Sequence, residues 1–310
     1  MKRIQLIMLT CGAVALSLGA TSCFTGIEST PKITAHDVKR EKIPDKPEDS
    51  YLSGIDRQPF AEWHPGKRFY ITDNKVSLML GSTGASAGDL AGDTVTLKNI
   101  SSATSVTGEE VTDITFTTSA GTDITYRAGY SPEKLRENGI VEIPFMIEES
   151  LIRDVTARLK GNTYYIITTA WYDEDGNARN GRKFVPVKVE DVVFGNSFYP
   201  ARLLMTDENG KPFSLYLSLG KDLKAPRKFS NIFSLTDPRL HYPLITDDNW
   251  KLIINGRVAL DMTRDEARLA LGAPANIDRR PGYSFMREIW TYENGIFLIF
   301  EDGLLKSFRQ

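Results

Sequence analysis

The sequence predicts an α+β protein built mostly from antiparallel β-sheet. Short β-branched or aromatic runs separated by Gly, Asn, Asp and Ser recur from residue 51 to about 245, which is typical of strands joined by tight turns. A helix-start signature at 263–266 and two turn signals, at 294–295 and 302–303, predict a helix followed by a three-stranded antiparallel meander. The expected segments are an N-terminal signal (1–22), a tether (23–50), a β-rich body (51–245) and a C-terminal module (246–310).

The first segment has the build of a signal peptide. Lys2 and Arg3 make its start positive, residues 4–18 are mostly apolar, and small residues fill 20–22 just before Cys23. The apolar stretch is shorter than the ~20 residues that cross a bilayer, so cleavage is expected. An ordinary secretory signal and an uncleaved transmembrane helix are the alternatives. The segment resembles the lipobox of bacterial lipoproteins, which implies that Cys23 is the lipid attachment site, with diacylglycerol on its thiol and an acyl chain such as palmitate on its amine.

Cysteine usage and charge exclude several classes of function. Of the two cysteines in the chain, Cys11 would leave with the signal and Cys23 would carry lipid. Without a free thiol, disulfide scaffolding, thiol catalysis and cysteine metal sites are excluded. Loss of Lys2 and Arg3 takes the formal net charge from −2 to −4, which is too mild to indicate a nucleic-acid partner. We expect no cofactor, no metal and no nucleic acid.

Residues 24–50 are expected to form an extended, solvated tether. They mix prolines with charges of both signs and contain few apolar residues, so they cannot bury enough surface to fold alone. A flexible coil of this length reaches on the order of 30 Å. In the lipoproteins that the signal resembles, residues after the cysteine influence sorting. Residues 24–27 carry no aspartate for inner-membrane retention and no acidic cluster for surface export, so we expect an outer-membrane anchor that faces the periplasm.

The body is expected to hold many short strands and few helices. Ser131-Pro132 predicts a short helix that ends at Gly139, and apolar residues at helical spacing predict another over 148–160, with Gly161 as its stop. The strand runs are 69–72, 94–97, 114–117, 124–126, 164–167, 184–189, 202–205 and 213–219.

A weak internal repeat spans 66–129 and 161–220. Three pairs of turn glycines are offset by 95, 89 and 89 residues, namely Gly66 and Gly161, Gly92 and Gly181, and Gly121 and Gly210. The spacing predicts two copies of a small antiparallel barrel or half-sandwich. The alternative is that two hairpin-rich stretches share glycines through turn spacing alone.

The C-terminal module carries the most specific motif. Thr263-x-x-Glu266 is a capping box, in which the hydroxyl and the carboxylate bond free amides at a helix start, and Gly272 and Pro274 end the helix. Asn294-Gly295 and Asp302-Gly303 suit two-residue hairpin turns. The expected strands cover 287–293, 296–301 and 304–308.

The order of these features resembles the small outer-membrane lipoprotein domain known as SmpA/OmlA, or BamE-like. The matching residues are Met262-Thr263, Glu266, Leu271-Gly272-Ala273-Pro274, Trp290-Thr291-Tyr292 and Phe300-Glu301-Asp302-Gly303-Leu304-Leu305. Asp261 stands where the family usually has glycine, and Pro281-Gly282 interrupts the stretch that normally carries a second helix. The resemblance covers about the last 50 residues and implies a protein-interaction domain, although a fold carries over more safely than an assembly role.

The predicted meander is apolar on both faces. Two-residue turns would put Trp290, Tyr292, Phe297, Ile299, Leu304 and Phe308 on one face and Ile289, Ile296, Leu298, Phe300 and Leu305 on the other. One short helix covers only one face, so the other must pack on residues 229–254 or on a partner. The candidate packing or partner surface is Trp290, Tyr292, Phe297, Ile299, Phe300 and Phe308.

No metal-binding pattern emerges from the histidines or the acidic turns. His36, His64 and His241 are the only histidines, and their spacing does not suit a metal site. Residues 173–177 resemble the start of a calcium loop, but Phe184 stands where the bidentate Glu is needed. A hairpin turn is expected there.

Two serines match catalytic patterns only by letter. Ser86 lies in a G-x-S-x-G run that leads into a strand, whereas a nucleophile elbow must lead into a helix. Ser131-Pro-Glu-Lys134 has no accompanying Lys-Thr-Gly, so a helix cap is expected. No catalytic residue is assigned.

These observations favour a non-enzymatic, membrane-tethered lipoprotein that binds an envelope protein or acts as a scaffold. The first alternative is a glycan or small ligand bound by the β-rich body, where exposed Trp63, Trp171 or nearby tyrosines would stack on it. The second is a periplasmic enzyme in which a polar cleft brings Ser86 to His64 or His241.

Overall fold

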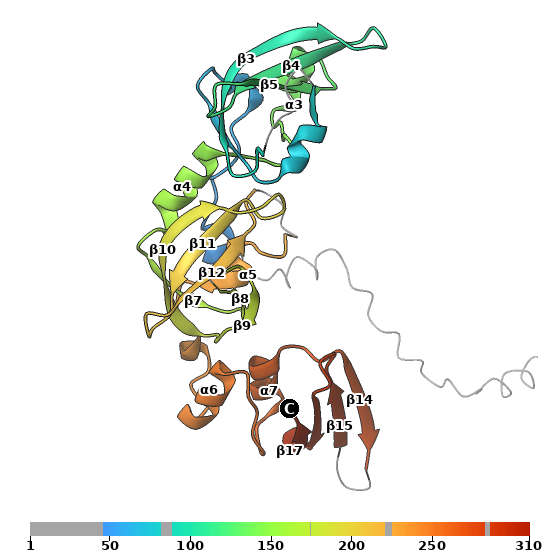
Figure 1. Cartoon of the computed structure of the whole chain (residues 1–310). Coiled ribbons are helices and arrows are strands. Elements are labelled where there is room, and N and C mark those ends of the chain that lie inside the picture. Colours follow the sequence, from blue (N-terminus) through green and yellow to red (C-terminus); the bar gives the residue numbers. More distant parts are fainter. Residues whose placement is uncertain (1–45, 82–88, 174, 221–224, 283–285) are drawn as a thin grey trace, which may run out of the picture. The chain divides into compact units, whose positions relative to one another are not determined.

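The computed structural model describes residues 46–81, 89–173, 175–220, 225–282 and 286–310 (Figure 1). The chain divides after Asp45, and the fold below is that of Lys46–Gln310. Cys23, His36 and Ser86 therefore lie outside the described residues, together with the signal and most of the tether.

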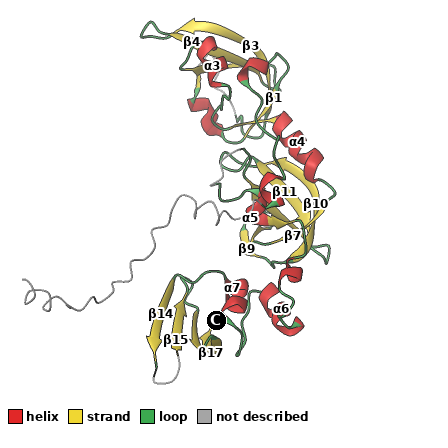
Figure 2. Cartoon of the chain, turned by 180° about the vertical axis from the view of Figure 1, so that it is seen from behind, coloured by secondary structure: helices red, strands yellow, loops and turns green. Residues whose placement is uncertain are grey.

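The described residues form three antiparallel sheets accompanied by short helices (Figure 2), which confirms the predicted α+β, mostly antiparallel class. We name the three parts the first β-unit (strands β1–β6), the second β-unit (β7–β13) and the C-terminal module (246–310). Each part has its own cluster of buried apolar side chains.

The first β-unit has the strand order β2-β5-β4-β3-β1-β6. Its strands are β1 (Arg68–Ile71), β2 (Leu80–Gly81), β3 (Thr94–Thr104), β4 (Glu110–Thr117), β5 (Asp123–Ala128) and β6 (Met146–Glu148). Its helical turns are η2 (Phe60–Glu62), η3 (Asn74–Leu78) and α3 (Pro132–Asn138). Helix α3 starts and ends as predicted, because the Ser131 hydroxyl accepts from the Lys134 amide and Gly139 takes a φ of 78°.

The second β-unit has the strand order β13-β7-β10-β11-β12-β8-β9. Its strands are β7 (Thr163–Ile166), β8 (Ala170–Tyr172), β9 (Ala178–Asn180), β10 (Val185–Phe194), β11 (Ala201–Thr206), β12 (Pro212–Leu217) and β13 (Phe233–Ser234). Helix α4 (Glu149–Leu159) buries the predicted apolar stripe in its core, and α5 (Phe229–Ile232) precedes β13.

The end of the expected tether belongs to this unit. Residues 47–50 form the helical turn η1 (Pro47–Ser50). The Glu48 carboxylate accepts from the Leu235 amide at 2.9 Å, and Asp49 pairs with Lys228 at 3.4 Å. These contacts hold residues 46–50 to the folded chain, which composition alone could not predict.

The two β-units share one topology, which supports the predicted repeat. The order β6-β1-β3-β4-β5-β2 recurs as β13-β7-β10-β11-β12-β8. Both long strands bulge at the same point, directly after Leu97 in β3 and directly after Val189 in β10. The amides of Gly66 and Gly161 donate to the carbonyls of these two residues at 2.8 Å.

The structure corrects one equivalence within the repeat. Val95 pairs with Phe69, and Val187 pairs with Tyr164. Val187 is therefore the counterpart of Val95, at an offset of 92 residues instead of the 89 that separates Gly92 from Gly181. Around the third pair of glycines, Gly121 and Gly210, the predicted offset of 89 holds. Phe116 of β4 pairs with Ile124 of β5 as Met205 of β11 pairs with Phe213 of β12.

The C-terminal module consists of two helices and a four-stranded meander. The helices are α6 (Asp247–Ile254) and α7 (Arg264–Leu271), and the strands, in order, are β14 (Asn276–Pro281), β15 (Met286–Thr291), β16 (Phe297–Glu301) and β17 (Leu304–Arg309). The capping box of Thr263 and Glu266 is present as predicted. Strand β14 was missed because its sequence, Asn-Ile-Asp-Arg-Arg-Pro, lacks apolar alternation, as is common for edge strands.

The predicted grouping of the meander faces is wrong because the first turn is one residue longer than expected. Thr291 pairs with Phe297, so residues 293–295 form a three-residue loop, with Gly295 at a φ of 80°. A hairpin of this kind places glycine at the left-handed position that follows a type I turn. A shift of one residue moves every side chain of the strand to the opposite face.

Both helices pack on the same face of this sheet. Trp250 and Ile253 of α6 and Ala267 and Ala270 of α7 share one buried cluster with Trp290, Leu298, Phe300 and Leu305. The expectation that residues 229–254 cover the second face is therefore wrong, because α6 joins α7 on the first.

Candidate functional site

The predicted surface residues divide between the two faces of the meander. Trp290 and Phe300 are fully buried with ring centroids 4.6 Å apart, and the Trp290 indole donates to Glu288 at 3.1 Å. Tyr292 is half-buried, its hydroxyl donates to the Gly272 carbonyl at 3.3 Å, and burial raises its pKa to about 12. These three residues pack the module.

The remaining predicted residues are more open. Phe297 and Ile299 are half-buried on the outer face, where the Arg309 guanidinium lies 5.5 Å from the Phe297 ring centroid. An exposed Arg287–Glu301 ion pair of 2.7 Å crosses that face. Phe308 is 37% exposed on the edge strand β17 and pairs with Leu298 of the inner face. Charge and apolar area alternate on the outer face, so no continuous apolar patch results.

The other candidate residues do not assemble a site. His64 and His241 are exposed and belong to different parts of the chain. Trp63 and Trp171 are buried, which contradicts their expected role as exposed stacking platforms. Asp173 forms a turn as predicted, accepting from the Asn177 amide at 2.7 Å. Among the residues that the structure describes, no group of three or more His, Cys, Asp or Glu could hold a metal ion.

An apolar groove of about 590 Å³ lies between residues 241–245 and helix α7, and we call it the groove of the C-terminal module. One wall is the chain segment before α6 and the other is the exposed side of α7. The lining residues are His241, Tyr242, Pro243, Leu244, Ile245, Thr263, Asp265, Glu266, Arg268 and Leu269. Mostly apolar hollows with a few polar groups at the rim are typical binding sites.

Two leucines of the segment before α6 are exposed, of which Leu244 lines the groove and Leu240 lies four residues earlier in the same segment. Leu240 is 73% exposed and Leu244 is 96% exposed. Side chains this open contribute nothing to the core, and a leucine in water loses the free energy that burial would give it. Their grouping beside a groove distinguishes them from apolar residues scattered singly over a surface.

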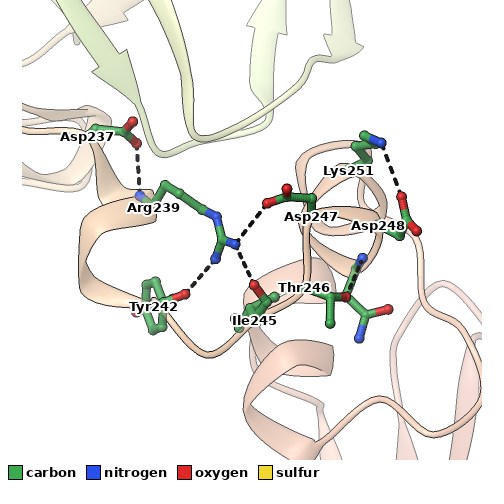
Figure 3. Close-up of polar contacts among 9 residues, drawn as sticks. Asp237, Arg239, Tyr242, Ile245, Thr246, Asp247, Asp248 and Lys251 are labelled. Carbon is green, nitrogen blue, oxygen red and sulfur yellow. Dashed lines mark hydrogen bonds and ion pairs between the residues drawn. The ribbon is translucent and has the colours of Figure 1, made fainter.

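Arg239 holds the segment that displays these leucines (Figure 3). Its guanidinium donates to the Tyr242 carbonyl at 2.5 Å, to the Ile245 carbonyl, and to the Asp247 carboxylate at 3.2 Å. It also lies 5.1 Å from the Trp250 ring centroid. One planar side chain thereby ties residues 242 and 245 to the first turn of α6, using the fork geometry that suits Arg and not Lys.

The opposite wall is held by a second set of polar contacts. Thr246 caps α6 by accepting from the Asn249 amide at 3.2 Å, and the Asn249 side chain donates to Glu266 of α7 at 2.7 Å. Burial of Glu266 opposes its ionisation, but bonds from the Thr263 amide, Asn249 and the Thr263 hydroxyl keep its pKa below the usual value. The groove is therefore pre-formed between two braced elements.

A different polar cluster lies inside the first β-unit. The Lys67 ammonium is 2.6 Å from Glu148, and both side chains are buried, at 8% and 2% exposure. Lys67 also donates to the Gln58 side chain at 2.7 Å and lies 5.4 Å from the Trp63 ring centroid. The second carboxylate oxygen of Glu148 is buried and accepts no hydrogen bond from any described residue.

The repeat shows that this ion pair is not a requirement of the fold. By strand register, Asn162 and Leu235 of the second β-unit occupy the positions of Lys67 and Glu148. The second copy is thus built without charges there.

No protein-family model matches the chain, and no curated protein matches it. Within the described part of the chain, no helix is long and apolar enough to cross a membrane.

Sequence reasoning missed Arg239, Leu240 and Leu244. The segment was expected to supply cover for the meander, because its apolar residues suggested burial. Pro238 and Pro243 could have indicated that this segment is an irregular loop. Prolines interrupt helices and strands, so the side chains between them do not share one buried face.

Proposed function

We propose that this protein is a non-enzymatic lipoprotein, tethered through Cys23 to the periplasmic face of the outer membrane, that binds a protein partner through the groove of its C-terminal module. The observation that carries the proposal is the pair of exposed leucines on a segment braced by Arg239. Exposed apolar side chains lower the stability of the free protein. Because these side chains are already held rigidly, less conformational entropy is lost when a partner binds them.

The shape and lining of the groove support a partner with an apolar face, such as an amphipathic helix. A helix that lies in a groove contributes apolar residues at i, i+3, i+4 and i+7, and the α7 wall is itself helical. Asp265 and Arg268 at the rim offer one charge of each sign for orientation. The BamE-like resemblance of the same module points to the same class of function.

Site-specific photocrosslinking in intact cells tests the proposal. We expect a benzophenone amino acid in place of Leu244 to form a discrete adduct with one envelope protein. Leu78 provides a matched control, since it is 79% exposed on the first β-unit. Leu240→Ser should abolish the adduct at 244 without changing the melting temperature. The same adducts at positions 78 and 244 would contradict the proposal.

The anchor has a separate test. Cys23→Ala should leave an exported protein that no longer incorporates labelled fatty acid, because the thiol is the acceptor of the lipid. Label retained by the Cys23→Ala protein would contradict the lipoprotein assignment while leaving the groove proposal standing.

A further inference from the structure

The two copies of the β-unit differ sharply at one equivalent pair of strand positions. In the first unit the cross-strand pair is Asp113 and Arg127, joined by two hydrogen bonds of 2.7 Å. In the second unit the equivalent pair, 89 residues later in each strand, is Arg202 and Tyr216. In the second unit, Arg202 lies over the Tyr216 ring, and its guanidinium donates to the Ser214 hydroxyl at 3.0 Å and to the Asp173 carbonyl at 3.3 Å.

Further aromatic and cationic residues gather around this pair. Tyr172 of β8 lies edge-on to Tyr216 with ring centroids 5.0 Å apart, and Tyr199 lies 6.2 Å from Tyr216. Arg227 is placed between two rings, with its guanidinium 5.2 Å from the Tyr172 centroid and 5.3 Å from the Tyr199 centroid. We name these residues, Tyr172, Tyr199, Arg202, Tyr216 and Arg227, the Arg–Tyr face. All five are half-buried.

The guanidinium of Arg227 is oriented but not neutralised. One of its nitrogens donates to the Tyr172 hydroxyl at 2.9 Å, and its carbonyl accepts from the Ser218 amide at 2.8 Å. Among the described residues, no carboxylate lies within ion-pair distance of it. Asp173, in the turn after β8, directs its carboxylate to Asn177 instead.

We infer that the Arg–Tyr face of the second β-unit binds a carboxylate-bearing saccharide. A guanidinium held between aromatic rings is weakly hydrated and keeps its planar fork, which matches a carboxylate. The tyrosine hydroxyls add donors and acceptors for the ring hydroxyls of a sugar. This site is independent of the groove of the C-terminal module.

The same observations disfavour a peptide at this face. Peptides that add a strand or lie in an apolar groove are disfavoured, because Arg202 and Tyr216 lie on β11 and β12, which have hydrogen-bonded neighbours on both sides. A saccharide forms its bonds with side chains through its hydroxyls and carboxylate, and the half-buried Arg–Tyr face offers such side chains. An acidic peptide, which arginine clusters also recognise, is distinguished by the titration with tetraglutamate.

Calorimetric titration of the full chain in detergent tests this inference. The probes are tetragalacturonate, its fully methyl-esterified form, a tetraglutamate peptide and inorganic phosphate. We expect saturable binding of tetragalacturonate and none of the methyl ester, because esterification removes the charges that Arg227 recognises. Arg227→Lys keeps the charge but loses the fork, and should weaken binding about tenfold, the equivalent of one charge-assisted hydrogen bond. Tyr172→Phe should weaken binding in the same direction.

Arg127→Lys is the matched control, since it changes an arginine on the equivalent face of the first β-unit. It should leave affinity unchanged, and melting curves of all three variants should show that each one folds. The inference is overturned by failure of tetragalacturonate to bind, by equal affinity for its methyl ester, by preference for tetraglutamate or phosphate, or by an equal effect of Arg127→Lys.

Discussion

The buried Lys67–Glu148 pair yields the sharpest prediction about stability. Lys67→Met removes the ammonium 2.6 Å from the carboxylate and the bond to Gln58. Glu148, whose side chain is 2% exposed, would then be left charged without its cation, and would keep only the hydrogen bond from the Gln58 amide at 3.2 Å among the bonds shown to described residues. Removing one partner of a buried ion pair costs about 3 to 5 kcal/mol, which is a large share of the stability of a typical domain.

The second β-unit supplies the compensating design. Lys67→Asn combined with Glu148→Leu copies Asn162 and Leu235 at the equivalent positions. Replacing both members of a buried pair removes two desolvation costs along with the attraction, and is often neutral or stabilising. We therefore expect the double variant to be more stable than Lys67→Met by about 3 kcal/mol.

Urea unfolding followed by tryptophan fluorescence measures this directly, because Trp63 packs against Lys67. The control is Lys98→Met, since Lys98 and Asp123 form an exposed pair of the same chemistry, and exposed pairs contribute about 0 to 1 kcal/mol. The reasoning would be refuted if Lys67→Met cost no more than Lys98→Met, or if the double variant were as unstable as Lys67→Met.

Three further predictions concern other parts of the chain. Gly181→Ala should prevent correct packing of the second β-unit, because an added Cβ would lie 1.9 Å from the Trp171 ring. The near-ultraviolet circular dichroism of Trp171 should lose intensity, whereas Gly129→Ala, with open space at its Cβ and no positive φ, should leave it unchanged. Burial lowers the pKa of Lys183 from 10.5 to about 8, so the unfolded chain binds more protons between those values and stability should rise with pH over that window. Lys183→Met should be more stable than the parent at pH 7 and should show a smaller rise, while an unchanged pH profile would contradict the assignment. Trp290→Ala should cost about 3 to 5 kcal/mol and lower mainly the calorimetric transition of the C-terminal module, because Trp290 is buried in the cluster of that module, which Phe184 of the second β-unit contacts through Trp250. A uniform shift of all transitions would show that this contact couples the cores.

Local sequence determined the helices, several turns and the class of fold. These features depend on residues only a few positions apart in the chain. They are the capping box at Thr263 and Glu266, the Ser131 cap and the apolar spacing of α4. Their energies come from hydrogen bonds and side-chain contacts along one helix. The offset of 89 residues between Gly121 and Gly210 was equally visible, because both take a positive φ and left-handed turns need glycine wherever the chain is folded.

Register and burial were decided only by the tertiary structure. Asn294-Gly295 suits both a two-residue and a three-residue hairpin. The two-residue turn would put Trp290 and Phe297 on the same face, whereas the three-residue loop puts them on opposite faces. The residues of the turn do not distinguish the two hairpin types. The hairpin type depends on which side chains of β15 and β16 pack into the core.

The groove and the Arg–Tyr face depend on contacts between distant segments. Asn249 of α6 meets Glu266 of α7 across 17 residues, and Arg227 meets Tyr172 across 55 residues. A single sequence shows that these side chains exist and how they are charged, but not which others they meet. Such contacts require the whole chain to fold, because their free energy comes from groups that the sequence separates and packing brings together.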